Sequence, residues 1–438
     1  MPVPFAVTWP EPHLDVSAPI SEGEIDALAE RLFAGIERGK VLVAMSGGVD
    51  SSVAAALLVR AGFDCVGCFM RLGTVGEDVD ETCETGSVRL HHRGCCSVGD
   101  AADARTVAAT LGIEFHALNF RDDFGRVIDY FVDEYANGRT PNPCVRCNDW
   151  LKFGRLHEQA KQLGARYVAS GHYARIARAG ASGPRLLRGV DHTKDQSYVL
   201  FGVGRAQLDE MLLPVGELEK SVVRDLARAL NLPVFDKPDS QEICFVPDDD
   251  YAGLVERRRP ELGAGARGKG VIRDADGAEV GQHDGHHKFT VGQRRGVGVA
   301  LGHPIYVIET RPAANEVRVG TADELLVGGC VAGEPNWLTP TDPAPTESWH
   351  RCRARCRYNG VAVPAEYRVL GAESAPSGPT PSGRPGGFEV RFDEPVRAVA
   401  PGQAVVIYDD QNPDLVLGGG WIARAFRDGD PSGTIPHA

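Results

Sequence analysis

Residues 41–52 read VLVAMSGGVDSS, and this stretch decides the fold that we expect. An apolar, β-prone run is followed by two adjacent glycines and then by an alanine- and leucine-rich helix from Val53 to Ala61. Adjacent glycines allow a tight turn that brings backbone N–H groups close to an anion, and the N-terminus of the next helix adds partial positive charge. Nearby serines add hydroxyl donors, and Asp50 offers a carboxylate to Mg²⁺. The stretch therefore predicts a phosphate-binding loop, although an ordinary strand–turn–helix has a similar pattern.

Composition limits the possible classes of function. The 438 residues carry a formal net charge of −13, so any binding to RNA must use local basic patches. Eleven cysteines are too few and too scattered for a secreted disulfide scaffold, and they fit reactive or metal-binding thiols in a reducing cytosol better. The longest apolar run, Val53 to Val59, is too short to cross a membrane, and we expect neither a signal peptide nor a transit peptide. These observations predict a cytoplasmic protein that acts without a membrane.

The periodicity of the chain predicts three domains. Residues 1–206 contain an N-terminal extension and then strands alternating with helices, a pattern typical of an α/β doubly wound parallel sheet with its ligand at the carboxyl ends of the strands. Residues 207–283 predict a small α+β connector that includes an amphipathic helix at 221–230. Residues 284–438 contain short strands with glycine turns, which predict a β-barrel with an inserted disordered loop at 373–387.

Two further stretches place cysteines in polar turns. Residues 140–148 read TPNPCVRCN, and residues 239–245 read DSQEICF. Prolines stiffen the first of these loops, while Arg146 and the start of a helix near Trp150 are both expected to lower the pKa of the Cys147 thiol. The sequence therefore points to reactive thiols in two separate segments.

These motifs together resemble a known family. The glycine loop is not a Walker A motif and is similar to the loop of the N-type ATP pyrophosphatases, which split ATP into AMP and pyrophosphate. The whole set follows the order seen in the tRNA-specific 2-thiouridylases and spans roughly residues 40–425. It comprises the glycine loop, TPNPCVRCN, SGHY at 170–173, KDQS at 194–197, DSQEICF, and TVGQRRG at 290–296. The resemblance implies an ATP- and Mg²⁺-dependent tRNA-uridine 2-sulfurtransferase that converts the wobble uridine of the anticodon to 2-thiouridine. It also implies a monomer whose partners are tRNA and a persulfide donor protein, either a cysteine desulfurase or a relay.

The resemblance implies roles for particular residues. Cys244 is expected to carry the persulfide, and Cys147 is expected to release its sulfur and leave a Cys147–Cys244 disulfide, so the two thiols must approach at some stage. Contacts to ATP are expected from Ala44, Met45, Ser46, Gly47, Gly48, Val49, Asp50, Ser51, Met70 and Gly171. Contacts to the target base are expected from Asn142, Pro143 and Cys144, and contacts to tRNA from Lys194, Asp195, Gln196, Arg357 and Tyr358.

One departure from the family keeps alternatives open. Many members have an aspartate where this chain has Cys144, and a thiol is a weaker general base than a carboxylate unless it is ionised. Cys144, Cys147 and Cys244 together also allow an iron–sulfur cluster with one open iron, or a zinc ion. The sequence favours the persulfide route over a cluster. The rival functions are another ATP pyrophosphatase that acts on RNA and a metal-bearing RNA-binding module without catalysis.

The remaining candidates have simpler interpretations. Cys65, Cys68 and Cys330 are expected in the core, and His286–His287 are expected in a solvated turn. The Cys95–Cys96 pair is expected to be structural or part of the cleft. Arginines alternate with smaller residues from 351 to 358, and this period places four guanidinium groups on one face of a strand. We interpret that face as a track for RNA phosphates.

Overall fold

The computed structural model of this chain describes residues 20–73, 98–178, 183–239, 243–246, 250–262, 269–371, 373–376 and 384–427. Cys95, Cys96 and part of the predicted loop at 373–387 lie outside these ranges. The described residues divide into two compact units, one drawn from residues 1–124 and 147–247 and the other from residues 125–146 and 248–438.

The first unit is built on a five-stranded parallel sheet with the order β3-β2-β1-β4-β7. Its strands are β1 (Lys40–Ala44), β2 (Asp64–Arg71), β3 (Glu114–Asn119), β4 (Tyr167–Ala169) and β7 (Met211–Leu212). The middle residues of β1 are fully buried, as expected for a strand that is covered on both faces. The predicted α/β parallel sheet is therefore confirmed.

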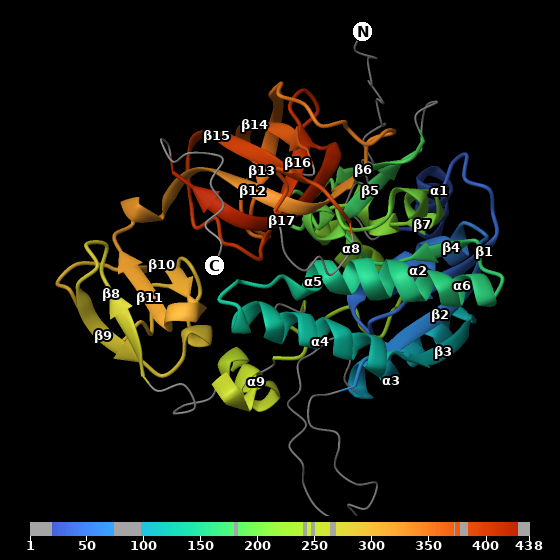
Figure 1. Cartoon of the computed structure of the whole chain (residues 1–438). Helices are drawn as coiled ribbons and strands as arrows, with labels where there is room; N and C mark the ends of the chain where they lie inside the picture. Colours follow the sequence, from blue (N-terminus) through green and yellow to red (C-terminus); the bar gives the residue numbers. More distant parts are fainter. Residues whose placement is uncertain are drawn as a thin grey trace, which may run out of the picture. The chain divides into compact units, whose positions relative to one another are not determined.

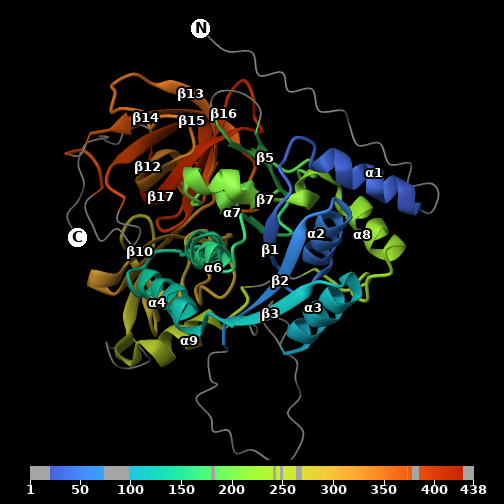
Figure 2. The same ribbon diagram turned by 90° about the vertical axis from the view of Figure 1, so that its right-hand side faces the viewer.

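Helices cover both faces of this sheet. They are α1 (Glu22–Leu32), α2 (Val49–Arg60), α3 (Val98–Leu111), α6 (Leu156–Gln162), α7 (Ser197–Leu200) and α8 (Lys220–Ala229). Figure 2 shows α1, α2, α3 and α8 on one side of the sheet and α6 on the other. Helix α1 begins at the predicted capping box, in which Ser21 and Glu24 bond to each other's backbone N–H groups. A small antiparallel hairpin of β5 (Ala174–Ala177) and β6 (Arg185–Arg188) follows β4.

Strand β7 and helix α8 belong to this first unit. β7 pairs with β4 at the edge of the sheet, and Leu226 of α8 shares a core with Leu28 of α1 and Leu57 of α2. The domain boundary predicted at residue 206 therefore falls inside a unit that continues to residue 247.

The segment after the TPNP motif is helical earlier than expected. The sequence predicts a helix from Trp150, whereas the structure has α5 (Pro143–Arg146), a π-helix η1 (Cys147–Arg155) and then α6. The side-chain oxygen of Asn142 accepts a hydrogen bond of 3.4 Å from the backbone N–H of Val145, and proline is well suited to the first position of a helix. Pro143 thus begins a helix, whereas the sequence predicted only that the prolines stiffen a loop.

The second unit contains a four-stranded sheet and a closed barrel (Figure 1). The sheet has the order β10-β11-β8-β9, and its strands are β8 (Gly270–Arg273), β9 (Glu279–His283), β10 (Tyr306–Arg311) and β11 (Glu316–Gly320). The barrel has the order β12-β15-β14-β13-β16-β17, with β12 (Leu326–Trp337), β13 (His350–Arg355), β14 (Val363–Leu370), β15 (Gly387–Arg397), β16 (Ala404–Asp409) and β17 (Val416–Phe426). Helix α9 (Tyr251–Arg258) and most of α4 (Arg121–Ala136) also belong to this unit. The predicted C-terminal β-barrel is confirmed, and Cys330, Cys352 and Ala354 lie in its core.

No helix among the described residues is long and apolar enough to span a membrane.

Candidate active site

The glycine loop leaves β1 at its carboxyl end and turns directly into α2. Gly47 has a φ of +72°, and a Cβ at this position would clash with the backbone oxygen of Asp100. Gly48 is the extended N-cap residue of α2. Glycine is therefore required at residue 47, both for its backbone angle and for its close approach to α3.

Serine side chains hold the loop in shape. The Ser51 hydroxyl accepts a hydrogen bond of 3.2 Å from the backbone N–H of Ser46 and donates one of 3.2 Å to the backbone oxygen of Gly48. The Ser52 hydroxyl donates to that same oxygen at 2.8 Å, and its side chain is fully buried. Ser52 is thus a support for the loop.

Gly171, just after the neighbouring strand β4, packs against the backbone of the glycine loop. It follows β4, and a Cβ at this residue would lie 2.5 Å from the backbone nitrogen of Ser51. Met70 is half-buried near the carboxyl end of β2, two residues beyond the partner of Ala44 in the parallel register. The predicted ATP residues therefore lie at the carboxyl edge of one sheet, and their close backbone packing at a helix N-terminus fits a bound phosphate chain.

Asp50 makes two contacts that the motif did not indicate. Its Oδ1 accepts a hydrogen bond of 2.8 Å from the Tyr173 hydroxyl and lies 2.6 Å from Lys220 Nζ. The pKa of Tyr173 is raised well above its usual value, mainly by burial and to a smaller extent by the nearby Asp50 carboxylate. Sequence reasoning missed Lys220, because a lysine at the start of an amphipathic helix usually faces solvent.

A second lysine binds the backbone of the loop. Lys237 Nζ donates to the backbone oxygen of Gly47 at 2.9 Å and to Asp100 and Asp103 at 2.7 and 2.5 Å. Burial opposes its charge, but the hydrogen bonds to these two carboxylates raise the pKa of Lys237 overall. This residue was also missed, because its partners lie more than a hundred residues away in the sequence.

The two candidate catalytic thiols both belong to the first unit. Cys147 is the half-buried first residue of η1. The side-chain amide of its neighbour Asn148 donates a hydrogen bond of 3.2 Å to the backbone oxygen of Val199. Cys244 is half-buried in a turn in which the backbone N–H of Val246 donates a hydrogen bond of 2.9 Å to the backbone oxygen of Ile243. The neighbouring Phe245 ring lies edge-on to Phe124, with 5.6 Å between ring centres.

The predicted core thiols differ from these two. Cys65, Cys68 and Cys330 are buried, which confirms their assignment to the core. Burial raises the pKa of Cys65 and of Cys68 to about 12, so both remain protonated and unreactive at neutral pH.

The predicted target-base residues lie in the second unit. Asn142 is buried and caps α5, Pro143 is buried, and Cys144 is exposed. The loop before them is held by the Gln403 amide, which donates to the backbone oxygens of Thr140 and Pro141 at 3.1 and 3.0 Å. This anchoring keeps the Cys144 thiol at a defined position on the surface of its unit.

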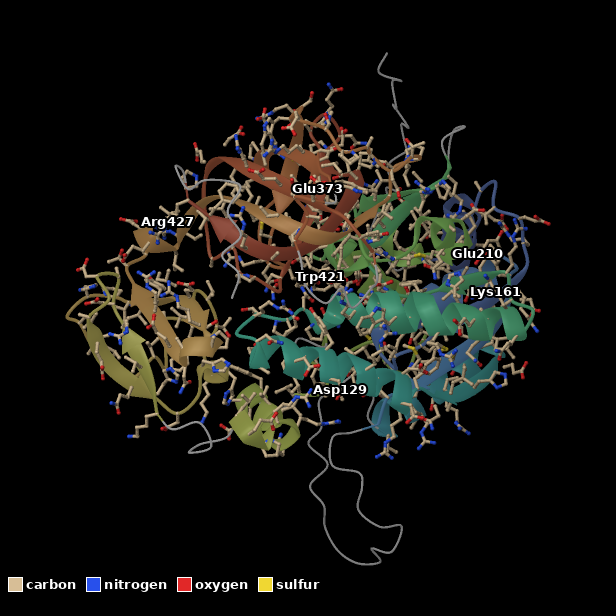
Figure 3. All side chains as sticks on the ribbon, viewed as in Figure 1. Asp129, Lys161, Glu210, Glu373, Trp421 and Arg427 are labelled. Atoms are coloured by element: carbon tan, nitrogen blue, oxygen red, sulfur yellow. The ribbon has the colours of Figure 1, made fainter. Side chains whose placement is uncertain are left out.

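Arg146 has a different role from the predicted one. It was expected to act as a cation beside Cys147, but its guanidinium is buried, pairs with Glu334 at 3.1 Å and lies 4.0 Å above the ring of Trp421 (labelled in Figure 3). The helix also begins at Pro143, so Cys147 does not precede a helix near Trp150. Neither predicted source of a lowered thiol pKa is therefore placed as expected.

The predicted tRNA contacts divide into buried and exposed residues. The Asp195 carboxylate is buried and lies 3.3 Å from the Arg188 guanidinium. It also accepts a hydrogen bond of 3.0 Å from the backbone N–H of Ser197. The side-chain oxygen of Gln196 accepts a hydrogen bond of 2.9 Å from the backbone N–H of Tyr173. Both side chains shape the loop beside the glycine motif. Lys194 is partly exposed, and Arg357 and Tyr358 are exposed after β13.

The predicted row of four arginines is wrong as a continuous phosphate track. Arg351 makes two hydrogen bonds of 2.8 Å to Asp393 of β15, which also lower the pKa of that carboxyl. Arg355 is buried and donates to the backbone oxygens of Arg357 and Tyr358. Asp393 lies on a strand that β14 separates from β13, and among the described residues it pairs with Arg351 alone, so the alternation within β13 could not indicate this partner.

The expectation of solvated turn histidines is also wrong. His286 and His287 are buried, with His286 Nε2 at 2.9 Å from the backbone oxygen of Ala136 and His287 Nε2 at 3.2 Å from Glu256. Within the described ranges, no group of three or more His, Cys, Asp or Glu side chains is arranged to hold a metal ion.

Comparisons with known proteins identify the family. The model for a tRNA methyl transferase HUP domain matches residues 39–248, a tRNA methyl transferase PRC-barrel domain matches 263–321, and an aminomethyltransferase beta-barrel domain matches 379–422. The tRNA-specific 2-thiouridylase MnmA of Rhodopirellula baltica is 45% identical over 415 residues, covering 90% of this chain and 99% of the relative. The enzymes of the same name from Carboxydothermus hydrogenoformans and Solibacter usitatus are 44% and 46% identical, covering 89% and 87% of this chain and 99% and 98% of each relative. Identity of this extent along nearly the whole chain shows that it belongs to the tRNA-specific 2-thiouridylase MnmA family.

Proposed function

We propose that this chain is a tRNA-uridine 2-sulfurtransferase that activates the C2 oxygen of the wobble uridine with ATP and replaces it with persulfide sulfur. The observation that supports this most directly is the glycine loop, where Gly47 and Gly171 let three backbone segments approach too closely for any side chain. That geometry suits the phosphates of ATP. Membership in the 2-thiouridylase family supplies the substrate class.

Adenylation is needed because the uracil C2 carbonyl resembles that of a urea, and its oxygen is a poor leaving group. The C2 oxygen attacks the α-phosphorus and pyrophosphate leaves, so AMP becomes the group that departs from C2 later. Residues 44–51, Met70 and Gly171 are proposed to hold ATP. Asp50 is proposed to face Mg²⁺, which supplies neutralisation of phosphate charge when it is bound.

Sulfur transfer is proposed to need both thiols. The terminal sulfur of a Cys244 persulfide attacks C2 and AMP leaves. The Cys147 thiolate then attacks the Cys244 Sγ, which breaks the sulfur–sulfur bond, frees the 2-thiouridine and forms a Cys147–Cys244 disulfide. A thiol reductant supplies two electrons to restore both thiols, and a persulfide donor protein reloads Cys244.

The target base must leave its stack to reach this chemistry. Asn142, Pro143 and Cys144 are proposed to contact it, and Lys194, Asp195, Gln196, Arg357 and Tyr358 are proposed to contact the rest of the anticodon arm. Because the Asp195 carboxylate is buried and its hydrogen-bonding capacity is used, its contribution is proposed to act through the shape of its loop. We propose that the chain works as a monomer in the cytoplasm.

The test is mass spectrometry of the anticodon after incubation of the protein with ATP, a persulfide source and unmodified tRNA transcript. We expect 2-thiouridine together with AMP and pyrophosphate. Cys147→Ser and Cys244→Ser should each abolish thiolation, whereas Cys352→Ala in the barrel core should retain it. Full thiolation by either serine variant would refute the two-thiol route.

The same preparation separates the rivals. An iron–sulfur route predicts iron and inorganic sulfide in anaerobically purified protein and their loss in Cys144→Ser. A binding module without catalysis predicts no formation of AMP and pyrophosphate with any tRNA. A different ATP pyrophosphatase predicts AMP formation without 2-thiouridine.

A further inference from the structure

Lys220 places a nearly buried ammonium group beside the first turn of α2. The residue begins α8, a helix that packs beside α2 (Figure 2), and it is only 9% exposed. Its Nζ lies 2.6 Å from Oδ1 of Asp50, the second residue of α2, and 2.9 Å from Oδ1 of Asp239. The centre of the Tyr173 ring lies 5.7 Å from the same nitrogen. Two carboxylates and an aromatic ring therefore hold this ammonium at the glycine loop.

Pairing with Asp239 does not by itself account for this lysine. The Asp239 carboxylate also lies 2.8 Å from Lys194 Nζ and 2.8 Å from the Arg224 guanidinium. Burial opposes its ionisation, but the hydrogen bonds from Lys194 and Lys220 lower the pKa of Asp239 to about 2. Taking a third cation out of water for a carboxylate that already has two is unfavourable unless the cation serves a further purpose.

The hydrogen-bond donors of the two lysines at the loop are used differently. An ammonium group has three N–H donors. Lys237 uses all three, because its Nζ donates to one backbone oxygen and two carboxylates at 2.9, 2.7 and 2.5 Å. Lys220 uses two, one for each carboxylate named above, and within the described part of the chain its ammonium has no third hydrogen-bond acceptor. Lys220 therefore keeps one donor for a ligand at the loop.

The glycine loop has no cationic side chain of its own to offer a phosphate chain. Residues 41–52 contain neither lysine nor arginine, whereas a Walker A loop carries a lysine that reaches the phosphates. The first turn of α2 offers backbone N–H groups and the partial positive charge of a helix N-terminus, but it also carries the acid Asp50. A triphosphate bound there needs a full positive charge close to that acid. The ammonium of Lys220, 2.6 Å from Asp50, supplies it from another helix.

We propose that Lys220 is a catalytic residue whose third donor binds the phosphate chain of ATP, while Asp50 and Asp239 hold its ammonium in place. A hydrogen bond from an ammonium to a phosphate is charge-assisted and strong in a partly buried site. When pyrophosphate departs, it keeps the electron pair of its broken bond to the α-phosphorus, and the bound ammonium stabilises that charge. This inference rests on the proposed function only in requiring that the loop bind ATP.

The first test is calorimetric binding of a non-hydrolysable ATP analogue with Mg²⁺, in the absence of tRNA. Lys220→Met should weaken binding by roughly tenfold to a hundredfold, as expected for the loss of one hydrogen bond to a charged group. Arg224→Met is the matched control, because it also removes one cation from Asp239, and Arg224 forms no ion pair with Asp50 among the described residues. The control should bind the analogue as tightly as the unaltered protein does.

The second test uses the unaltered protein, so it applies even if Lys220→Met proves unable to fold in thermal unfolding. Nitrogen-15 NMR of the lysine ammonium groups reports on Lys220 directly, and Lys220→Arg assigns its resonance by removing it while keeping the charge. Inorganic pyrophosphate should shift this resonance, because the ammonium gains a phosphate acceptor. Adenosine, which has no phosphate, should leave it in place.

Several outcomes would overturn the role of Lys220. They are normal affinity for the analogue in folded Lys220→Met, an equal loss of affinity in Arg224→Met, and an ammonium resonance that pyrophosphate leaves unmoved or that adenosine shifts as well. A protein that binds the analogue through Lys220 but forms no 2-thiouridine would refute the proposed function and leave this inference standing. Absence of nucleotide binding in calorimetry would overturn both.

Discussion

Replacing Gly171 by alanine tests whether the loop depends on close backbone packing. A Cβ at this position would lie 2.5 Å from the Ser51 nitrogen, 2.6 Å from the Asp50 carbonyl carbon and 2.9 Å from the Ser51 Cα. All three atoms belong to the backbone at the first turn of α2, so no side chain can swing aside. The shortfall from ordinary contact is about 0.9 Å, and overpacking of this kind costs about 1–3 kcal/mol.

Two measurements check this prediction. The unfolding temperature should fall by roughly 2–12 °C, the range that this cost implies for a domain of this size. Calorimetric binding of ATP should weaken by about tenfold or more, because the displaced turn carries the N–H groups proposed to bind phosphate.

A matched control separates the clash from the general effect of alanine. Gly125 lies inside α4, and a Cβ added there would have no atom within 4 Å, so Gly125→Ala should leave ATP binding unchanged and stabilise the helix by up to about 1 kcal/mol. If Gly171→Ala bound ATP normally and unfolded at the original temperature, the reasoning about the loop would be refuted.

Three further predictions concern stability and pH. Ser52→Ala should lower the free energy of unfolding by about 0.5–1.5 kcal/mol in chemical denaturation, because it removes the shorter of the two serine hydrogen bonds to the Gly48 oxygen; an unchanged midpoint would contradict the supporting role of Ser52. Arg146→Met should cost about 3–5 kcal/mol by removing the ion-pair partner of the buried Glu334 carboxylate, whereas Arg155→Met, which breaks an exposed pair with Glu158, should leave the free energy of unfolding nearly unchanged; similar costs for the two would be inconsistent with burial as the cause. Burial, together with the charge of Lys152, lowers the pKa of His172 well below its usual value. As the pH drops below about 6.5, this imidazole is therefore protonated in the unfolded chain but not in the folded one, and the free energy of unfolding falls. His172→Gln should therefore flatten the dependence of unfolding free energy on pH between about 5 and 6.5, and an unchanged slope would argue against this assignment.

Much of the first unit followed from local pattern. The alternation of buried strands with helices, the capping box at Ser21 and the glycine turn at residues 47–48 each depend on residues close together in the sequence, and the structure has all three. The alternation in β13 likewise placed Cys352 and Ala354 in the barrel core. The family's motifs named the loop residues, and Gly171 indeed packs against Ser51.

Predictions failed where a charge found a partner far along the chain. Arg351 was assigned to a phosphate track, but its partner Asp393 lies on another strand. His287 was expected in solvent, yet it is buried beside Glu256. The helix after Asn142 was expected too late, because its start depends on a side-chain cap that the proline pattern alone does not distinguish from a loop.

The sequence alone determined most of the strands and helices, the position of the glycine loop and the candidate thiols, because each of these depends on spacing within a few residues. Only the tertiary structure decided which ions meet: Lys220 joins Asp50 to Asp239, and Lys237 joins Gly47 to Asp100. The physical reason is that burial and electrostatic pairing depend on distance in space. A lysine has the same character in the sequence whether it ends in solvent or between two carboxylates.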